Sequence, residues 1–307
     1  MSMEMKDKMI LITGGTDGIG KVAAQKLAEM GGHVVIVGRN PRKTQVVVDG
    51  IRAATGNPNV DFLIGDLSVQ ADVRRVACEY TERYDRLQVL INNAGALFLR
   101  RQLSADGFEM SFALNHLGYF TLTYELLDLI KTSAPARIIN VASAAHYGAQ
   151  LDFNQLTTPK GLFGYGAYGE SKLMNVLFTY ELARQLEGSG VTVNCLHPGL
   201  VATNFGKNNG GIYRPIMNFY HLFAISPEAG AETIIYLASS PEVEGVSGKY
   251  FTQKKAVRSS TVSYDQNSWQ ILWQASLKLA KLNGHAPCEE PTEQPELDRE
   301  VAGTITT

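Results

Sequence analysis

The feature of this sequence that most constrains its fold is a repeated alternation between short apolar runs and longer amphipathic stretches. Apolar runs occupy the ranges 8–13, 33–38, 60–65, 87–91, 137–142 and 191–197. Helical patterns lie between several of them, at 19–30, 69–84, 106–131 and 167–188. Strands that are apolar throughout are typical of parallel sheets covered by helices on both faces. We therefore predict an α/β fold with a doubly wound parallel sheet of about seven strands, the seventh being a shorter strand at 248–252.

The domain organisation follows from the same pattern. The sequence has 307 residues, with neither an internal repeat nor a second run of core-forming elements, so we predict one domain over 1–283. It would include a C-terminal helix near 265–281. An apolar loop near 204–225 is either a mobile lid or a buried amphipathic helix. Prolines among acidic residues predict a disordered acidic tail at 284–307.

The charge balance and the short first apolar run limit which classes of protein are compatible with this chain. Lys and Arg total 28 and Asp and Glu 30, a net charge of −2 that gives no reason to expect nucleic-acid binding. The first apolar run is too short for a signal sequence or a bilayer span, so we expect a cytoplasmic protein without a membrane anchor. Assembly into a homo-oligomer is left open.

The spacing of the cysteines and histidines does not match a metal-binding motif. Three widely spaced cysteines, Cys78, Cys195 and Cys288, suit a reduced compartment and suggest no disulfide framework. The six histidines show neither H-x-x-x-H nor H-E-x-x-H spacing, so no metal is predicted.

A glycine-rich turn follows the first strand and precedes the first helix. It reads Thr13-Gly-Gly-Thr-Asp-Gly-Ile-Gly20. Glycines allow a tight turn and a close approach to a pyrophosphate, while the helix N-terminus offers free N–H groups and partial positive charge. Because the turn lies between a strand and a helix, it predicts dinucleotide binding.

The T-G-x-x-x-G-I-G spacing resembles the short-chain dehydrogenase/reductase family, and further motifs of that family follow in order. They are Asn92-Asn-Ala-Gly95, Tyr168-Gly-Glu-Ser-Lys172 and Pro198-Gly199. The resemblance covers roughly 7–252. A nearer resemblance is to its retinol-dehydrogenase-like branch, through Val-Ala-Ser143-Ala-Ala-His146 and the ranges 166–168, 181–186, 245–251 and 272–279. The resemblance implies a Rossmann-type sheet, a nicotinamide cofactor and oxidoreductase activity.

The resemblance also implies a set of cofactor contacts. They are Gly14, Thr16, Asp17, Gly18, Ile19, Gly20, Arg39, Asp66, Leu67, Asn92, Ala94, Gly95, Tyr168, Lys172, Pro198, Gly199, Val201 and Thr203. For two of them a structural role is an alternative: Asp66 could cap a helix, and Asn92 could stabilise the end of its strand.

The choice between the two nicotinamide cofactors depends on the end of the second strand. An acidic residue there would bind the ribose hydroxyls of NAD, whereas a basic residue would meet the extra phosphate of NADP. This chain has Gly38 where the family's NAD-selecting Asp falls, and Arg39 follows. We therefore favour NADP(H) over NAD(H), with an exposed surface charge as the alternative role of Arg39.

Tyr168 and Lys172 are four residues apart and so share one face of a helix. A phenol with a pKa near 10 is a poor base at neutral pH, and a neighbouring cation would lower that pKa. The resemblance implies that Tyr168 is the general acid/base and that Lys172 is its electrostatic partner and a ribose ligand.

Two further catalytic residues are implied by the resemblance. Ser143 would hydrogen-bond the substrate oxygen, and Asn115 would hold a water relay to the lysine. His146, three residues after Ser143, we interpret as a loop or pocket-wall residue.

The predicted function is NADP(H)-dependent hydride transfer to or from the carbonyl or alcohol carbon of a hydrophobic ketone, aldehyde or alcohol. The alternatives are a catalytically silent NADP(H)-sensing protein and a sugar-nucleotide epimerase.

Overall fold

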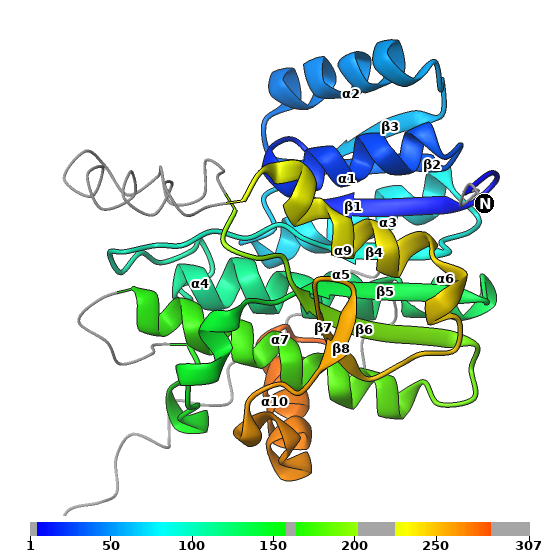
Figure 1. Cartoon of the computed structure of the whole chain (residues 1–307). Coiled ribbons are helices and arrows are strands. Elements are labelled where there is room, and N and C mark those ends of the chain that lie inside the picture. The colour runs from blue at the N-terminus through cyan, green and yellow to red at the C-terminus, as the bar shows by residue number, and fades with distance from the viewer. Residues whose placement is uncertain (1–4, 158–163, 202–224, 284–307) are drawn as a thin grey trace, which may run out of the picture.

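The apolar runs of the sequence form one sheet in the computed structural model, which describes residues 5–157, 164–201 and 225–283 (Figure 1). The strands are β1 (Met9–Thr13), β2 (His33–Gly38), β3 (Val60–Ile64), β4 (Val89–Asn92), β5 (Ala136–Val141), β6 (Val191–His197), β7 (Lys249–Thr252) and β8 (Lys255–Val257). The eight strands lie in the order β3-β2-β1-β4-β5-β6-β7-β8. All neighbours are parallel except β7 and β8, so the doubly wound fold is confirmed with one strand more than predicted.

Helices cover both faces of the sheet. The longer ones are α1 (Gly18–Glu29), α2 (Pro41–Thr55), α3 (Gln70–Arg83), α5 (Gly118–Glu125), α7 (Tyr165–Gln185), α9 (Pro227–Ser239) and α10 (Gln266–Leu279). Side chains of α1, α2 and α9 share one hydrophobic core, whereas those of α3, α5, α7 and α10 share the other. Neighbouring residues of β1 show the division, because Ile10 belongs to the first core and Leu11 to the second.

The predicted helix over 106–131 is divided. It contains α4 (Met110–Phe112), η1 (Ala113–Leu117), α5 and α6 (Leu127–Thr132). The η1 segment is a π-helical turn. Such turns are rare, occur often at functional sites, and shift the face that the following residues present. A hydrophobic pattern does not reveal this one-residue insertion.

Shorter helical turns complete the description. They are η2 (Ala144–Gly148), η3 (Phe153–Gln155), η6 (Pro241–Val243) and η7 (Thr261–Tyr264). The stretch 144–166 contains η2, η3 and the start of α7. Residues 158–163 within it lie outside the described residues.

Helix α10 forms an additional layer outside α7 (Figure 1). The ring of Trp273 lies 5.0 Å from that of Phe120 on α5 and 6.1 Å from that of Phe178 on α7. This helix falls within the range predicted at 265–281. The predicted lid, apart from Ile225, and the predicted tail at 284–307 lie outside the described residues.

Two expectations from composition can be compared with the structure. Cys195 is a free, buried thiol, but Cys78 is disulfide-bonded, so the expectation of unpaired cysteines is wrong for Cys78. Sequence spacing does not show which cysteines meet in space. No helix in the described part of the chain combines the length and apolar character that crossing a bilayer requires.

Candidate active site

The predicted site residues in the described part of the chain follow the carboxyl ends of β1 to β6 or lie on helices beside that edge. Parallel strands bring their carboxyl ends to one edge of a sheet, where ligands of such folds bind. A hollow of about 1000 Å³ lies instead at the amino ends of β4, β5 and β6 and includes Gln88, Ala136 and Val191. It contains none of the predicted site residues.

The glycine turn packs tightly against the end of β4. Gly14 has a φ of +67°, and a Cβ there would lie 2.8 Å from Ala94 Cα. A Cβ at Gly20 would lie 2.4 Å from Asn93 Nδ2. Asn93 Nδ2 donates to the carbonyl oxygen of Thr13 (2.8 Å), so this amide holds the turn in place. The backbone itself therefore forms the floor of the site.

The N-terminus of α1 opens beside a hollow of about 540 Å³. Its lining includes Thr16, Asp17, Lys21, Arg42 and Lys43. Asp17 accepts a hydrogen bond from the N–H of Gly18 (2.8 Å) and forms an ion pair with Lys43 (2.9 Å). Three of these five side chains are cationic, and this end of the helix favours anions.

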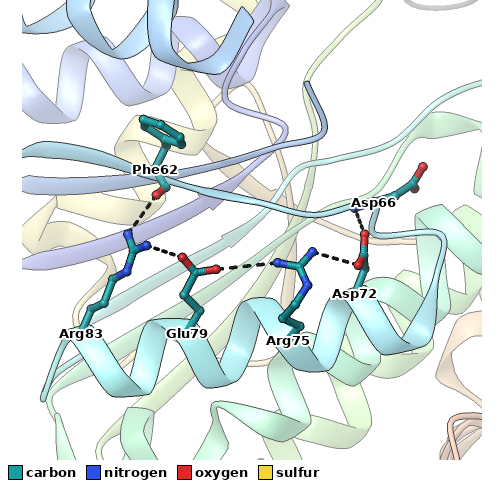
Figure 2. A network of polar contacts seen from close by, with 6 residues as sticks. All are labelled: Phe62, Asp66, Asp72, Arg75, Glu79 and Arg83. Atoms are coloured by element: carbon teal, nitrogen blue, oxygen red, sulfur yellow. Dashed lines mark hydrogen bonds and ion pairs between the residues drawn. The ribbon is translucent and has the colours of Figure 1, made fainter. Parts of the chain in front are cut away.

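Arg39 and Asp66 lie at the carboxyl ends of neighbouring strands. Arg39 Nη1 is 3.7 Å from Asp66 Oδ2, and its side chain is 79% exposed. Asp66 Oδ1 accepts hydrogen bonds from both the N–H and the hydroxyl of Ser68, while its own N–H donates to Asp72 Oδ2 on α3 (Figure 2). Asp66 therefore stabilises the turn before α3 but does not cap that helix, whose N-cap residue is Val69. Arg39 has its guanidinium at the surface.

Asn92 and Leu67 have buried side chains. Asn92 Nδ2 donates to Thr123 Oγ1 and to Asn140 Oδ1, both at 2.9 Å, inside the sheet–helix interface. The side chain of Leu67 is 4% exposed. The Asn92 side chain thus stabilises the end of its strand, which was the alternative to a cofactor contact. Only the backbone that follows β4 lies at the edge of the site.

Tyr168 and Lys172 lie on one face of α7, as their spacing predicts. Both side chains are buried. Lys172 Nζ donates to the carbonyl oxygen of Val141 at the end of β5 (2.8 Å) and lies 5.7 Å from the centroid of the Tyr168 ring. A Cβ at Gly95 would come within 3.5 Å of Lys172 Nζ, so the β4 turn closes over the ammonium group.

Ser143 completes the group around the phenol. It follows β5 and caps η2 by accepting a hydrogen bond from the N–H of Ala145 (3.2 Å). Burial raises the pKa of Tyr168 to about 12, while a hydrogen bond with the Ser143 side chain acts in the opposite direction. Burial also lowers the pKa of Lys172 to about 7. Without a ligand, the phenol is therefore held as a neutral acid, because burial outweighs the hydrogen bond with Ser143.

Asn115 lies within the π-helical turn and is completely buried. Its Oδ1 accepts from the N–H of Ala96 (2.9 Å), and its Nδ2 donates to the carbonyl oxygen of Ala96 (3.0 Å) and to Ser171 Oγ (3.1 Å). The side chain thus fastens the β4 turn to α7. The backbone carbonyl of Asn115 takes no part in these three hydrogen bonds.

The segment after β6 brings Pro198, Gly199 and Val201 toward α1. Gly199 has a φ of +93°. A Cβ at Gly230 of α9 would meet both Val201 Cγ2 (2.6 Å) and Ile19 Cγ2 (2.8 Å), so these two predicted contacts lie side by side. Thr203 lies outside the described residues.

His146 is buried beneath the site. Its Nδ1 is 2.6 Å from the carbonyl oxygen of Ser143, and its Nε2 accepts from the N–H of Ser260 (3.1 Å). Burial lowers the pKa of this imidazole. It is a supporting residue beneath the loop, consistent with its interpretation from the sequence.

Comparison with known proteins agrees with this arrangement. The model of the short chain dehydrogenase family matches residues 8–211. The chain belongs to this family. It is 39% identical to human retinol dehydrogenase 13 over 291 residues, covering 92% of this chain and 88% of the relative. It is 41% identical to human polyprenol dehydrogenase over 280 residues, covering 89% and 85% of the two chains.

Solved structures share the fold. A Mycobacterium paratuberculosis protein superposes with a TM-score of 0.73 at 28% identity, over 91% of this chain and 95% of the other. A Pseudomonas aeruginosa RhlG complex with NADP superposes with a TM-score of 0.66 at 27% identity, over 81% and 96% of the two chains. The chain is thus a member of an oxidoreductase family and is similar to retinol dehydrogenases.

Proposed function

We propose that the protein transfers hydride between NADP(H) and the carbonyl or alcohol carbon of a hydrophobic substrate. The observation that carries this proposal is the convergence of Tyr168, Lys172 and Ser143 beside the glycine turn. These groups come from α7 and from the end of β5, yet they are in contact at the carboxyl edge of the sheet. A phenol, a buried ammonium group and a hydroxyl are the donors that reversible carbonyl reduction requires.

The residues present fit a nicotinamide dinucleotide. The backbone at Gly14 and Gly20 has no room for a side chain, and the adjoining helix N-terminus favours a pyrophosphate. Cations surround the hollow beside it. The exposed guanidinium of Arg39 after β2 supports a role in binding a ribose phosphate. The relative crystallised with NADP supports this cofactor.

When bound, the cofactor supplies or accepts the hydride. The Ser143 hydroxyl orients the substrate oxygen, and the Tyr168 phenol donates a proton to that oxygen in reduction or removes it in oxidation. Lys172 stabilises the phenolate that remains after donation and binds the ribose. Pro198, Gly199 and Val201, after β6, are proposed as further cofactor contacts.

The substrate class is a hydrophobic ketone, aldehyde or alcohol. Two relatives are named for dehydrogenation of retinol and of polyprenol, which are apolar alcohols. The lid predicted at 204–225 would supply apolar contacts. Cytoplasmic location, self-association and the acidic tail stay predictions from the sequence.

The test is a turnover assay with purified protein, NADPH and a panel of apolar and polar carbonyl compounds, followed by nicotinamide absorbance. Tyr168→Phe should keep NADPH affinity and thermal stability but reduce turnover by at least ~10²-fold, the usual effect of a positioned acid/base. Full activity in this variant would refute the mechanism. NADPH binding without turnover of any compound by the wild type would favour the sensing protein instead.

A further inference from the structure

A buried polar side chain on α7, Asn175, contacts the active site without being part of any predicted motif. Asn175 lies one helical turn beyond Lys172 and is completely buried. Its Nδ2 donates a hydrogen bond to the backbone carbonyl oxygen of Asn115 (2.9 Å). The amide therefore holds the π-helical turn through its carbonyl.

This hydrogen bond fixes the orientation of the amide. A carbonyl oxygen can only accept, so the nitrogen of Asn175 must be the atom that faces Asn115. Its Oδ1 is then directed elsewhere. Asn175 Oδ1 and His116 Nδ1 are both buried side-chain atoms without an assigned hydrogen-bond partner. If His116 Nδ1 carries the proton, it can donate a hydrogen bond to Asn175 Oδ1.

The protonation state of His116 agrees with this pairing. Burial lowers the pKa of His116 to about 3, while its interaction with the Asn175 side chain opposes that effect. The imidazole is therefore neutral and has a single proton. With that proton on Nδ1, Nε2 can only accept, and the hydroxyl of Ser276 on α10 lies 2.9 Å from it.

The surroundings keep the imidazole in place. Its ring lies beside the aromatic rings of Phe112, Phe120 and Phe178, with centroid distances between 5.7 and 6.3 Å. Ser276 is also completely buried. The polar chain therefore runs through an apolar interior, where water does not compete for its hydrogen bonds.

We propose that Asn175 is a positioning residue for the reaction, held by His116 and Ser276. It fixes the backbone carbonyl of Asn115, and so the π-helical turn whose Asn115 side chain approaches Gly95, as Lys172 Nζ also does. The chain of donors runs from the Ser276 hydroxyl to His116 Nε2, from His116 Nδ1 to Asn175 Oδ1, and from Asn175 Nδ2 to Asn115 O. Helix α10 thereby takes part in shaping the active site. This inference rests on the proposed function.

A spectroscopic experiment tests the chain independently of activity. Long-range ¹H–¹⁵N spectra of the full chain labelled at histidine nitrogens report the tautomer of each imidazole, and His116→Phe identifies the signals of His116. We expect a neutral ring protonated on Nδ1 at pH 7. A proton on Nε2, or a charged ring, would overturn the proposal.

Kinetics tests the positioning role with a matched control. Asn175→Leu removes the donor to Asn115 with little change of volume. Asn194→Leu makes the same substitution at a buried amide on β6, which bonds only to backbone atoms of Val246 and Lys249 among the contacts described. We expect kcat to fall about tenfold more in Asn175→Leu than in Asn194→Leu, with KM for NADPH within about twofold. Equal kcat in the two variants would show that the role is only structural.

A double variant tests whether His116 acts through Asn175. His116→Phe should reduce kcat less than Asn175→Leu, and combining the two should add nothing further. Independent, multiplying effects would contradict the chain. If Tyr168→Phe is fully active while His116 has its proton on Nδ1, the proposed function fails and the hydrogen-bonded chain stands.

Discussion

The outer face of α3 and the interior between α5 and α7 both carry connected polar side chains, but of different kinds. Figure 2 shows the outer face, where Asp72, Arg75, Glu79 and Arg83 form a row of alternating charges one helical turn apart. These side chains are between 29% and 51% exposed. Exposed ion pairs of this type contribute about 0–1 kcal/mol each, because water and salt screen them.

The interior connects neutral groups instead. Asn92, Asn140 and Thr179 are completely buried and form consecutive hydrogen bonds of 2.9 Å from β4 through β5 to α7. Thr179 in turn donates to the backbone carbonyl of Asn175. The amide nitrogens of Asn92 and Asn140 and the hydroxyl of Thr179 each have an acceptor, whereas an unpaired buried donor would cost about 1–3 kcal/mol. The comparison indicates that interior amides determine the geometry of the site, whereas the surface row of α3 contributes little to it.

The largest expected effect concerns Arg74 and Glu125, a charged pair on the inner face of α3. Arg74 Nε lies 3.5 Å from Glu125 Oε1, with side chains 11% and 0% exposed, and Arg74 also donates to the carbonyl of Ala280. Glu125→Ala leaves a buried guanidinium without its carboxylate, so we expect a loss of about 3–5 kcal/mol in the free energy of unfolding. Urea denaturation measures this. Glu125→Gln, which retains an acceptor, should lose less, and equal losses would refute the charge argument.

Lys172→Met tests the buried ammonium group. We expect turnover to fall by at least ~10²-fold, because the phenolate of Tyr168 loses its stabilising charge. NADPH affinity should fall about tenfold or more, since a charged donor to the ribose is removed. Fluorescence titration and turnover assays measure the two effects. Lys254→Met, at an exposed lysine paired with Glu232, is the control and should change neither. Unchanged NADPH affinity in Lys172→Met would leave only its electrostatic role.

Arg39→Ala tests whether the exposed guanidinium of Arg39 binds the ribose phosphate of NADP, as the proposed function states. A guanidinium bound to the ribose phosphate of NADP contributes about 1.5–3 kcal/mol, so NADPH affinity should fall about ten- to a hundredfold while NADH affinity stays the same. Titration of both cofactors at fixed ionic strength measures this, with Arg83→Ala as the control. If the preference between cofactors does not change, Arg39 is an ordinary surface residue.

The smallest expected effect is that of Glu79→Gln in the row shown in Figure 2. Glu79 pairs with both Arg75 and Arg83, yet we expect a loss below about 1 kcal/mol in the free energy of unfolding and no change in turnover. The loss should shrink further at high salt. A loss as large as that of Glu125→Ala would mean that the contrast between the two regions is wrong.

Much of the fold could be predicted because its strands are apolar on both faces. The runs that form β1 to β6 were evident for that reason. Strand β8 was missed because its three residues are all exposed and carry no apolar pattern. Helix α2 was also missed, although its signals were present: Asn40 caps it, Pro41 begins it, and Gly56 ends it with a φ of +68°.

The proposed catalytic residues could be identified in the sequence because their motifs are local. His116 and Asn175 could not, because their roles depend on contacts between distant segments. Asn175, for example, meets the carbonyl of a residue 60 positions earlier. Likewise, spacing predicted a lowered pKa for Tyr168 from the lysine nearby, but burial has the larger effect in the folded chain.

The hairpin between β7 and β8 has a consequence for how copies of this protein can associate. Its turn residues, Gln253 and Lys254, both have a positive φ, as in the two-residue turns that follow the twist of a hairpin. The resulting edge strand is only three residues long and begins with an exposed lysine. Short, charged edges resist pairing with a strand from another molecule. The final hairpin therefore protects this margin of the sheet against aggregation, and any pairing of strands between copies would have to use the opposite edge, at β3.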